Sequence, residues 1–323
     1  MYAPFVWDMH GCPSRTPGND LTFALEKYRQ AGFDAVTVNV ADSFYELDAA
    51  IRTLASFRDQ LAEHSADYVF AGTLEELKSA RASGKLAVCF DVEGALSLGT
   101  QLDLVDLYYE LGVRWMAFVY NLRNEAGYGC HDDPDLGLTP FGRRLVDRME
   151  RVGMIKCCSH TGYRTALDVF AASSKPTILS HSNPRALVDH ERNVPDEVLR
   201  ACAATGGVVG INGVGIFLGS RQPTVDDYFR HLDYVVQLLG PAHVGIAFDS
   251  VFPRTTGEET DFHVERRTDY WPPSKGYDHP LTILGPELLP SVVAKMREAG
   301  YPQSAVEGIL GGNFARVAQQ CWK

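Results

Sequence analysis

The stretch LAVCFDVEGA (residues 86–95) joins a short run of apolar residues to two acidic residues at its end. Such a run, rich in Val and Phe, is typical of a strand that is buried on both faces of a parallel sheet. Seven more runs of this type occur along the chain and extend the same pattern. They are PFVWDM (4–9), DAVTVNV (34–40), RWMAFVY (114–120), MIKCCS (154–159), PTILS (176–180), GVVGIN (207–212) and HVGIAFD (243–249).

Helical patterns lie between these runs, and several of them end in Gly, the usual C-terminal stop of a helix. Examples are DLTFALEKYRQAG (20–32), FGRRLVDRMERVG (141–153), PDEVLRACAATGG (195–207) and VDDYFRHLDYVVQLLG (225–240). Alternation of about eight strands with helices predicts an α/β fold, a (β/α)8 TIM-type barrel. A doubly wound sheet is the structural alternative, but no GxGxxG motif follows the first strand.

The length of 323 residues allows one large domain, and we expect a single barrel domain over residues 1–323. Residues 252–280 are rich in turn formers and aromatic residues, which predicts a long loop or lid over the site. Residues 286–323 are expected to form C-terminal helices, two of them at 286–299 and 303–311.

Chemically active side chains follow most of the predicted strands. In a barrel of this type the C-terminal ends of the strands form one rim, and that rim carries the active site. Histidines and carboxylates together suit zinc and similar divalent metals. One carboxylate could bridge two metals and leave another free as a general base. The residues at this rim are Asp8, His10, Cys12, Asp91, Glu93, His160, His181 and Asp249.

Several interpretations of individual residues stay open. A single His at a strand end is more often structural, but three of them together with a buried-type carboxylate favour a metal site. Cys12 is either a thiolate ligand or a small buried residue beside the site, and a Cys–His nucleophilic dyad is a third interpretation. Arg192 precedes a predicted helix and is either a salt-bridge partner or a clamp for a substrate carboxylate. Tyr120 ends the fourth strand and is expected at the same rim.

The overall composition excludes several classes of protein. The formal net charge of −11 and the sequence pI near 5.4 argue against a nucleic-acid binder. No apolar run reaches the roughly 18 residues that a membrane helix needs, and the N-terminus does not read as a signal peptide. Seven scattered cysteines predict free thiols in a reducing compartment, and hence a cytoplasmic location.

Nine motifs spread over the chain form a recognisable set. They are WDMHGC (7–12), DVEGA (91–95), YNLRNEAGYG (120–129), GLTPFGRRLV (137–146), SHTG (159–162), SHSNPRAL (180–187), RNVPDEVLR (192–200), VGIAFDSV (244–251) and GILGGNFARV (308–317). With them the chain resembles the membrane dipeptidase (renal dipeptidase) family of zinc peptidases in the amidohydrolase superfamily, and its soluble bacterial branch in particular. This resemblance implies a barrel of the metal-dependent hydrolase kind.

The resemblance also implies roles for individual residues. His10 matches the first metal-binding His, and Glu93 matches the carboxylate that bridges two zinc ions. His160 and His181 match the histidines of the second zinc. Asp249 matches the acid that takes a proton from the metal-bound water. In the same comparison, Arg192 matches the arginine that holds the C-terminal carboxylate of the substrate.

Three positions depart from the family pattern. The first motif is usually His-x-Asp, but here Cys12 replaces the carboxylate, so we expect the first zinc site to be the weaker one. Tyr120 stands where the animal enzyme has a His near the substrate carbonyl, and we expect it to bind substrate and help stabilise the oxyanion. Cys157 stands where the family often has Asp.

The function predicted from the sequence is metal-dependent hydrolysis of the peptide bond of dipeptides, including those with a C-terminal D-residue. Two zinc ions per chain and a small peptide substrate are expected, without nucleic-acid or membrane partners, and a homodimer is compatible with the resemblance. One alternative is another amidohydrolase reaction on N-acyl amino acids or lactams. A second alternative is a family member with a weakened metal site and a binding or biosynthetic role.

Overall fold

The computed structural model describes residues 4–15, 20–43, 46–252 and 267–323. Its strands are short and nearly all parallel. They are β1 (Trp7–Cys12), β2 (Ala35–Asp42), β3 (Tyr68–Phe70), β4 (Leu86–Glu93), β5 (Val113–Ala117), β6 (Ile155–Cys157), β7 (Thr177–Ile178), β8 (Val209–Ile211), β9 (Val244–Ile246) and β10 (Ser250–Val251).

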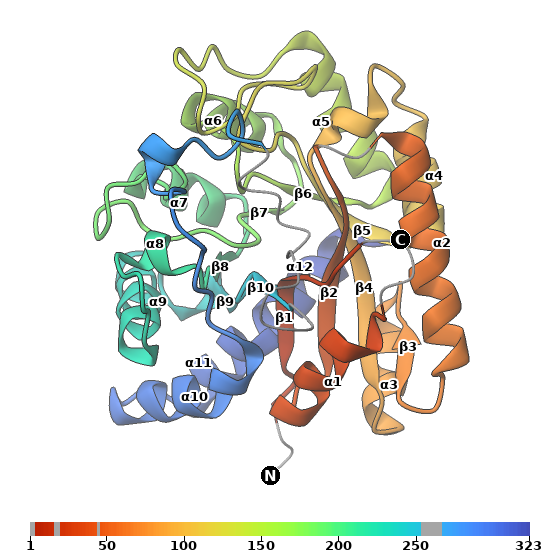
Figure 1. The fold of residues 1–323 in the computed structure, drawn as a ribbon, viewed down its shortest axis with the longest axis vertical. Coiled ribbons are helices and arrows are strands. Elements are labelled where there is room, and N and C mark those ends of the chain that lie inside the picture. Colours follow the sequence, from red (N-terminus) through yellow and green to blue (C-terminus); the bar gives the residue numbers. More distant parts are fainter. Residues whose placement is uncertain (1–3, 16–19, 44–45, 253–266) are drawn as a thin grey trace.

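Helices connect these strands and cover their outer face (Figure 1). The α-helices are α1 (Thr22–Ala31), α2 (Leu47–Glu63), α3 (Leu74–Ala82), α4 (Leu104–Leu111), α5 (Pro140–Val152), α6 (Tyr163–Ala172), α7 (Asp196–Ala204), α8 (Gly215–Leu218), α9 (Val225–Leu239), α10 (Leu289–Glu298), α11 (Gln303–Glu307) and α12 (Asn313–Cys321).

The sheet closes into a barrel of eight parallel strands. Its order is β7-β6-β5-β4-β2-β1-β9-β8, while β3 and β10 pair at its margins with β4 and β1. The two ends of this path meet just after β7, where Leu179 forms a parallel bridge with Val209. The backbone N–H of Leu179 donates to the Val208 carbonyl at 3.0 Å, and its own carbonyl accepts from Gly210 at 2.8 Å. The (β/α)8 barrel predicted from the sequence is therefore confirmed.

Local sequence explains where the principal helices begin and end. Thr73 and Thr224 cap α3 and α9 through reciprocal hydrogen bonds with an acidic residue three positions later, a capping box. Thr139 caps α5, whose first residue is Pro140, and Gly153 ends that helix in the left-handed conformation. These signals fix where each of the three helices begins and where α5 ends.

The barrel interior is filled by side chains and is sealed at its N-terminal end by α12. Trp7 packs on Phe314 of α12 with ring centroids 4.5 Å apart. Apolar residues from β1, β4 and β5 form one buried cluster with Val317 and Ala318 of the same helix. A larger cluster lies between the sheet and the outer helices. The interior below the rim is thus a packed core.

An irregularity in β1 directs its histidine into the barrel. Strict alternation would place His10 on the same face as Asp8, whereas Trp7 and Met9 belong to the interior cluster. The register of β1 against β2 shifts between Asp8 and Gly11, and a bulge of this kind re-aims a side chain. The Asp8 carboxylate holds the distortion because it accepts the backbone N–H of His10 at 3.0 Å.

All eight apolar runs singled out in the sequence coincide with barrel strands, whereas other elements carried no clear pattern. The strand β3 and the helix α2 were not expected, whereas α12 lies within residues 286–323, where C-terminal helices were expected. Residues 303–311 contain α11 and then a kinked segment at Gly308–Gly312. Part of the loop expected at 252–280, residues 253–266, lies outside the described residues.

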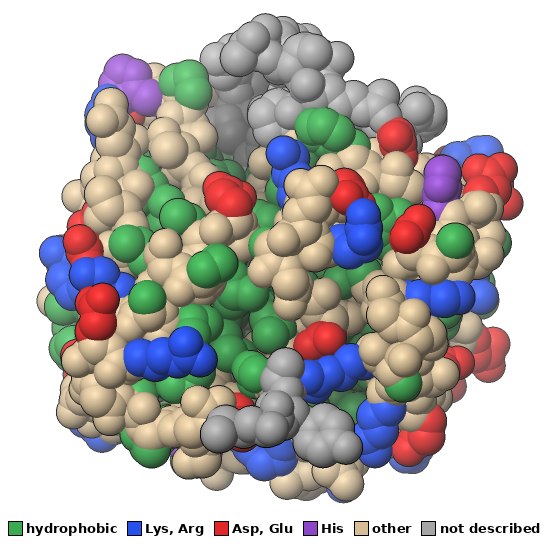
Figure 2. Space-filling view, turned by 90° about the horizontal axis from the view of Figure 1, so that it is seen from below, with side chains coloured by type: hydrophobic (Ala, Val, Ile, Leu, Met, Phe, Trp, Pro, Cys, Tyr) green, Lys and Arg blue, Asp and Glu red, His purple; other side chains and the backbone are tan. Residues whose placement is uncertain are grey.

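The outer surface mixes side chains of both charges. The face seen from below in Figure 2 carries basic and acidic side chains next to one another, with apolar side chains between them. Dissolved salt screens exposed charges of this kind over about 10 Å at 0.1 M ionic strength. Among the described residues, no helix combines the length and apolar character needed to cross a lipid bilayer.

Helix α9 contains a histidine that gives a prediction for stability. His231 is fully buried, and burial together with the positive charge of Arg230 lowers its pKa to about 4. The unfolded chain therefore binds the proton more readily, and stability falls as the pH drops from about 6.5 toward 4. The free energy of unfolding of the parent protein should decrease between pH 7.5 and pH 4.5. In His231→Leu we expect this decrease to be smaller by about 2–3 kcal/mol. Urea denaturation at the two pH values measures this, and identical losses in both proteins would contradict it.

Candidate functional site

Three histidines from three strands surround one carboxylate oxygen at the C-terminal rim. The Oε1 atom of Glu93, at the end of β4, lies 3.0 Å from the Nε2 atom of His181 and 3.1 Å from that of His160. His10 on β1 places its Nε2 atom 3.5 Å from the same oxygen. The Nε2 atoms of His160 and His181 are 2.9 Å apart. The convergence expected from the sequence is thus present in the structure.

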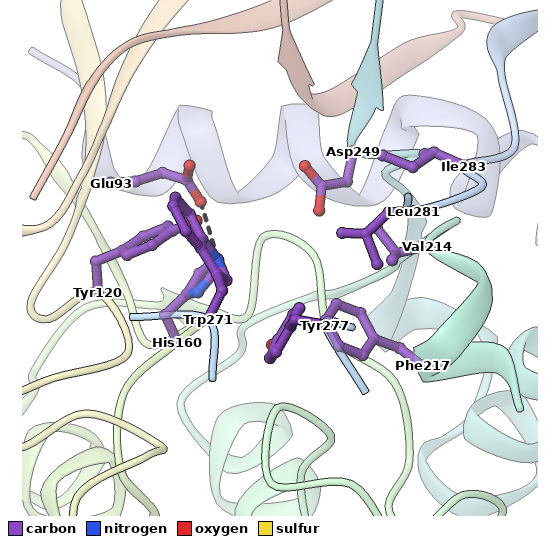
Figure 3. A pocket seen from close by; sticks show the side chains of 10 residues that line it. All are labelled: Glu93, Tyr120, His160, Val214, Phe217, Asp249, Trp271, Tyr277, Leu281 and Ile283. Atoms are coloured by element: carbon purple, nitrogen blue, oxygen red, sulfur yellow. Dashed lines mark ion pairs between the residues drawn. The ribbon is translucent and has the colours of Figure 1, made fainter. Parts of the chain in front are cut away.

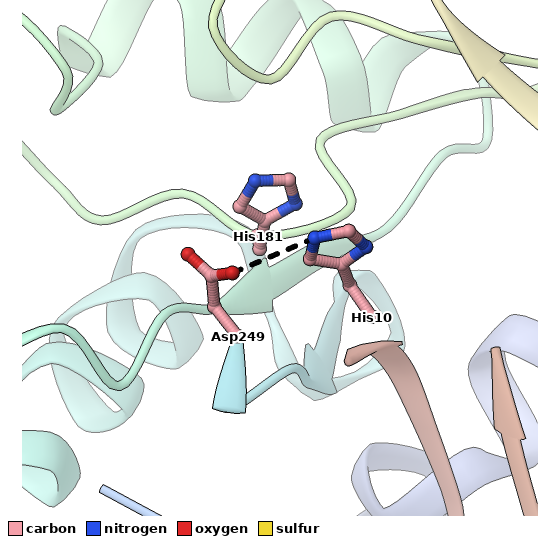
Figure 4. A group of neighbouring side chains, drawn as sticks. All are labelled: His10, His181 and Asp249. Atoms are coloured by element: carbon pink, nitrogen blue, oxygen red, sulfur yellow. Dashed lines mark ion pairs between the residues drawn. The ribbon is translucent and has the colours of Figure 1, made fainter. Parts of the chain in front are cut away.

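Cys12 and Asp249 complete the site on the side of His10. The Sγ atom of Cys12 lies 3.2 Å from the His10 Nε2 atom and 3.5 Å from Asp249 Oδ1. Asp249 Oδ1 lies 3.5 Å from the same nitrogen of His10, whose ring stacks on His181 at 4.1 Å (Figure 4). Possible ligand atoms of His10, Cys12 and Glu93, and those of Glu93, His160 and His181, each lie within 4.8 Å of one another.

A chain of buried polar residues orients the His10 ring. Its Nδ1 atom lies 3.0 Å from Asp91 Oδ2, and the other oxygen of Asp91 accepts from the Asn39 amide at 2.8 Å. Arg15 donates to both Asn39 and Asp42, which ties the chain to the loop that follows β1. A carboxylate accepts only, so the Nδ1 atom of His10 carries a proton toward Asp91 while its Nε2 atom faces Glu93. Against the effect of burial, the acidic groups Cys12, Asp91 and Glu93 raise the pKa of His10 well above its usual range.

Asn121 orients the His160 ring in the same way. Its Oδ1 atom lies 2.7 Å from His160 Nδ1, while its amide nitrogen donates to the Tyr270 carbonyl at 3.1 Å. The second contact turns the oxygen end of the amide toward the histidine, and the Arg192 Nε–H donates to the same Nδ1 atom at 3.1 Å. The third ring is held by Ser180, whose hydroxyl lies 2.8 Å from His181 Nδ1.

Burial sets the protonation of the site. It lowers the pKa of His160 and His181 well below the usual range, with the positive charges of Arg192 and His10 adding to the shift, so both rings are neutral near pH 7. Burial raises the pKa of Glu93 to about 8, and its Oε1 atom has no hydrogen-bond donor among the described residues. Two neutral imidazoles and the Glu93 carboxyl therefore meet at one buried point, and a divalent cation with N and O ligands fits this set of side chains.

Backbone strain is concentrated at the same place. Among the described residues, three that are not glycine have positive φ: Asn121 (54°), His160 (64°) and Asp249 (57°). Each such residue costs of the order of 1–3 kcal/mol and persists only where its surroundings impose it. All three follow barrel strands and contribute polar atoms to the site. The packing of the barrel therefore holds these residues at positive φ, although residues other than glycine prefer negative φ.

A pocket opens directly above the cluster (Figure 3). It encloses about 360 Å³, including space open to solvent, and the polar part of its lining is Glu93, His160 and Asp249. Tyr120 lines it as well, with its ring stacked on His160 at 4.0 Å. Asn212 donates to Asp249 Oδ2 at 2.9 Å and holds that carboxylate in place.

Arg192 lies behind the histidines. Its side chain is 2% exposed, and it does not belong to the described lining of the pocket. Its Nη2 atom donates to the His181 carbonyl at 2.9 Å, and its Nε atom lies 3.1 Å from His160 Nδ1. Its guanidinium also faces the Phe217 ring at 5.7 Å. In this arrangement Arg192 contacts the backbone and rings that position the site.

Sequence reasoning did not assign roles to Asn39 and Asn121 or to the apolar lining of the pocket. Asn121 stands in the quoted segment YNLRNEAGYG, and Asn39 ends an apolar run, which is the signal that could have found them. The lining residues between 271 and 283 follow the long segment after β10. The spacing of apolar residues in that segment does not indicate which side chains line the pocket.

The fold and the site together define a class of protein. Eight parallel strands form a barrel whose C-terminal rim gathers histidines and carboxylates around one buried point. This is a (β/α)8 barrel of the metal-dependent hydrolase kind.

The family within this class follows from a direct match. The sequence model described as membrane dipeptidase (peptidase family M19) matches residues 20–257. The chain therefore belongs to the membrane dipeptidase family, and the resemblance seen in its motifs is confirmed. Membership implies metal ions, for which the clusters described above supply candidate ligands.

Individual relatives agree with this assignment. An uncharacterized dipeptidase of Schizosaccharomyces pombe is 32% identical over 230 residues, which cover 69% of this chain and 54% of that protein. The chain spans between 54% and 60% of the length of the curated relatives that it matches. An amidohydrolase from Pseudomonas aeruginosa has a TM-score of 0.88 at 26% identity, covering 99% of this chain and 97% of its own.

A more distant structure shares the fold. A metallopeptidase from Rhodobacter sphaeroides, solved with a phosphinate mimic of the dipeptide L-Ala-D-Ala, has a TM-score of 0.80 at 21% identity. The superposition covers 99% of this chain and all of that one.

The contacts and φ of Asn121 generate a prediction. Asn121→Gly should lower the free energy of unfolding by about 1–3 kcal/mol, because His160 Nδ1 and the Tyr270 carbonyl lose their buried partner. Asn121→Ala should lose about 1–2 kcal/mol more, because alanine also resists positive φ. Urea denaturation of metal-stripped protein measures both. If alanine were tolerated as well as glycine, the strain at this position would be absent.

Proposed function

We propose that the protein hydrolyses the peptide bond of dipeptides, including those with a C-terminal D-residue, with two zinc ions at its rim. The observation that carries the proposal is the Glu93 Oε1 atom, which faces the Nε2 atoms of three histidines below the pocket. Membership of the membrane dipeptidase family supports it.

The residues that would hold the metals fall into two groups with one member in common. Glu93, His160 and His181 form the first group; His10 and Cys12, together with Glu93, form the second. Zinc in these positions would polarise the substrate carbonyl and lower the pKa of water so that it attacks near neutral pH. The second group has a thiol where the family usually has a carboxylate, so we propose that it binds its metal ion with the lower affinity.

Asp249 handles protons in this proposal. Its carboxylate faces Glu93 across the pocket, and burial raises its pKa above the usual range. Asn212 occupies its Oδ2 atom, which leaves Oδ1 turned toward the site. It accepts the proton of the attacking water and returns it to the leaving amine, as a general base and then a general acid.

Tyr120 and Arg192 complete the proposed machinery. Burial keeps the pKa of Tyr120 well above 10, so its hydroxyl stays protonated and can donate to the oxyanion. We keep Arg192 as the residue that binds the C-terminal carboxylate, which would require its guanidinium to exchange its present contacts for the substrate. Its place against Phe217, at the pocket wall, supports this role.

The proposal predicts a specific activity. Zinc-loaded protein should release alanine from L-Ala-D-Ala, the dipeptide whose mimic binds the R. sphaeroides neighbour. A zinc chelator should abolish the reaction and added zinc should restore it. Asp249→Asn should lower kcat by about 10²–10⁴-fold, because the proton acceptor is lost. Chromatography of the released amino acids over time measures each rate.

Matched substrates separate this activity from its alternative. N-Acetyl-alanine has an amide bond of similar size but no free amine on its acyl part. Turnover of N-acetyl-alanine well above that of the dipeptides would contradict the dipeptidase assignment and favour an N-acyl amino acid hydrolase. Metal counting during stepwise chelation should show one zinc lost before the other. The variant Cys12→Asp restores the usual carboxylate, and we expect its first zinc ion to be removed more slowly than that of the parent protein.

The clamp role of Arg192 gives a further prediction. Arg192→Met keeps much of the apolar stem and removes the charge. We expect kcat/KM for free dipeptides to fall about 30- to 1000-fold, because a desolvated carboxylate loses its partner. C-terminally amidated dipeptides lack that carboxylate and should be poor substrates of both proteins. Equal losses for free and amidated dipeptides would show that Arg192 acts only through His160 and His181.

We also propose a cytoplasmic location. All seven cysteines are free of disulfides, which supports a reducing compartment. The homodimer stays a prediction.

A further inference from the structure

We propose that the pocket selects dipeptides with a bulky apolar side chain and discriminates against charged ones. This inference rests on the proposed function and names the substrate class for the same site. Its basis is the division of the pocket lining into two halves of different chemistry, which Figure 3 shows. The carboxylates of Glu93 and Asp249 lie at one end of the pocket, Phe217 and Tyr277 lie opposite them, and Leu281 and Ile283 lie beside Asp249.

The apolar half comes from two segments that are far apart in sequence. Val214 and Phe217 lie between β8 and the end of α8, whereas the other members follow β10. These other members are Trp271, Tyr277, Leu281 and Ile283. Lys and Arg are absent from this lining among the described residues.

Hydrogen bonds between the two segments make this wall a built surface. Val214 and Ile283 form an antiparallel bridge. The Gly215 N–H donates to the Thr282 carbonyl at 2.9 Å, and the Leu284 N–H donates to the Gly213 carbonyl at 3.0 Å. Because backbone bonds on both sides of the bridge fix the two segments together, their side chains keep a constant distance from each other.

Further contacts fix the aromatic part of the wall. Phe217 packs against His190 at 4.9 Å and Tyr277 at 6.3 Å between ring centroids. The segment that carries Tyr277 is tied down by the ion pair of Lys275 with Glu191 at 2.5 Å. At the other side, Trp271 meets the Tyr120 ring edge-on at 5.9 Å.

These surroundings favour apolar side chains for a physical reason. Val214, Phe217 and Trp271 are at most 5% exposed, so a substrate group that touches them leaves water. An apolar group gains free energy in proportion to the area it buries. A carboxylate or ammonium group loses its hydration and meets no charge partner on the wall. A hydrophobic pocket of this kind discriminates by about 10- to 200-fold for small changes in apolar size.

A matched set of dipeptides tests this selectivity. Gly-Gly is the reference, and Gly-Leu, Leu-Gly, Gly-Asp and Asp-Gly place an apolar or a charged side chain of similar size at each position. We expect Leu to raise kcat/KM at least tenfold over Gly in at least one position, and Asp to lower it in that position. Hydrolysis of all five at similar rates would overturn the inference and leave the dipeptidase function intact.

One variant changes the wall at its partly exposed edge. Leu281→Arg places a cation among the apolar side chains, at a position whose partial exposure tolerates it. The kcat/KM ratio of the preferred Leu dipeptide to Gly-Gly should fall at least tenfold, and the ratio for the matching Asp dipeptide should rise. Leu107→Arg, on the outer helix α4, is the matched control and should leave both ratios unchanged. Unchanged ratios in Leu281→Arg would overturn the inference.

A binding measurement keeps this test independent of turnover. If none of the dipeptides is hydrolysed, the proposed function fails, and quenching of Trp271 fluorescence still reports occupancy of the wall. Trp271→Phe identifies the part of the signal that comes from this residue. Gly-Leu or Leu-Gly should then saturate at concentrations at least tenfold lower than Gly-Asp and Asp-Gly do. Equal saturation by the apolar and acidic dipeptides would overturn the inference.

Discussion

The site depends on one constraint: several hydrogen-bond acceptors share a buried point at the mouth of the barrel. The Oε1 atom of Glu93 faces three imidazole nitrogens at 3.0–3.5 Å. Polar groups that are this close and this deeply buried must be held by their neighbours, because burial makes each unpaired polar atom costly. The bulge in β1, the partners of each Nδ1 atom and the residues with positive φ all serve to hold this arrangement. Without them the rings would turn away.

The pocket above this point is assembled from two parts of the chain with different structural support. Its polar half stands on barrel strands and is fixed by the sheet, whereas its apolar half stands on the segments after β8 and β10. Asn121 connects the halves, because one end of its amide contacts His160 and the other contacts the Tyr270 carbonyl. Substitutions in the apolar half can therefore alter which molecules fit while the chemistry below stays the same.

Sequence alone predicted the barrel and the gathering of its rim residues. Buried parallel strands are apolar on both faces, so they stand out as runs, and residues such as His160 and Asp249 follow their runs at once. The direction of the His10 side chain, into the barrel, could not be predicted. Successive side chains of a strand normally point to opposite faces, and the bulge in β1 breaks this alternation. The apolar wall could not be predicted either, because long connections have no period that fixes where their side chains return.

The helix α12 has a consequence for how the chain is synthesised. Its residue Phe314 closes the barrel against Trp7, which belongs to the first strand made. All eight barrel strands leave the ribosome before this helix does, so the nascent barrel has an open lower end with its aromatic interior accessible to water. Such a species offers apolar surface to chaperones. Completion of the core, and with it the rigidity on which the rim relies, therefore waits until α12 has been synthesised.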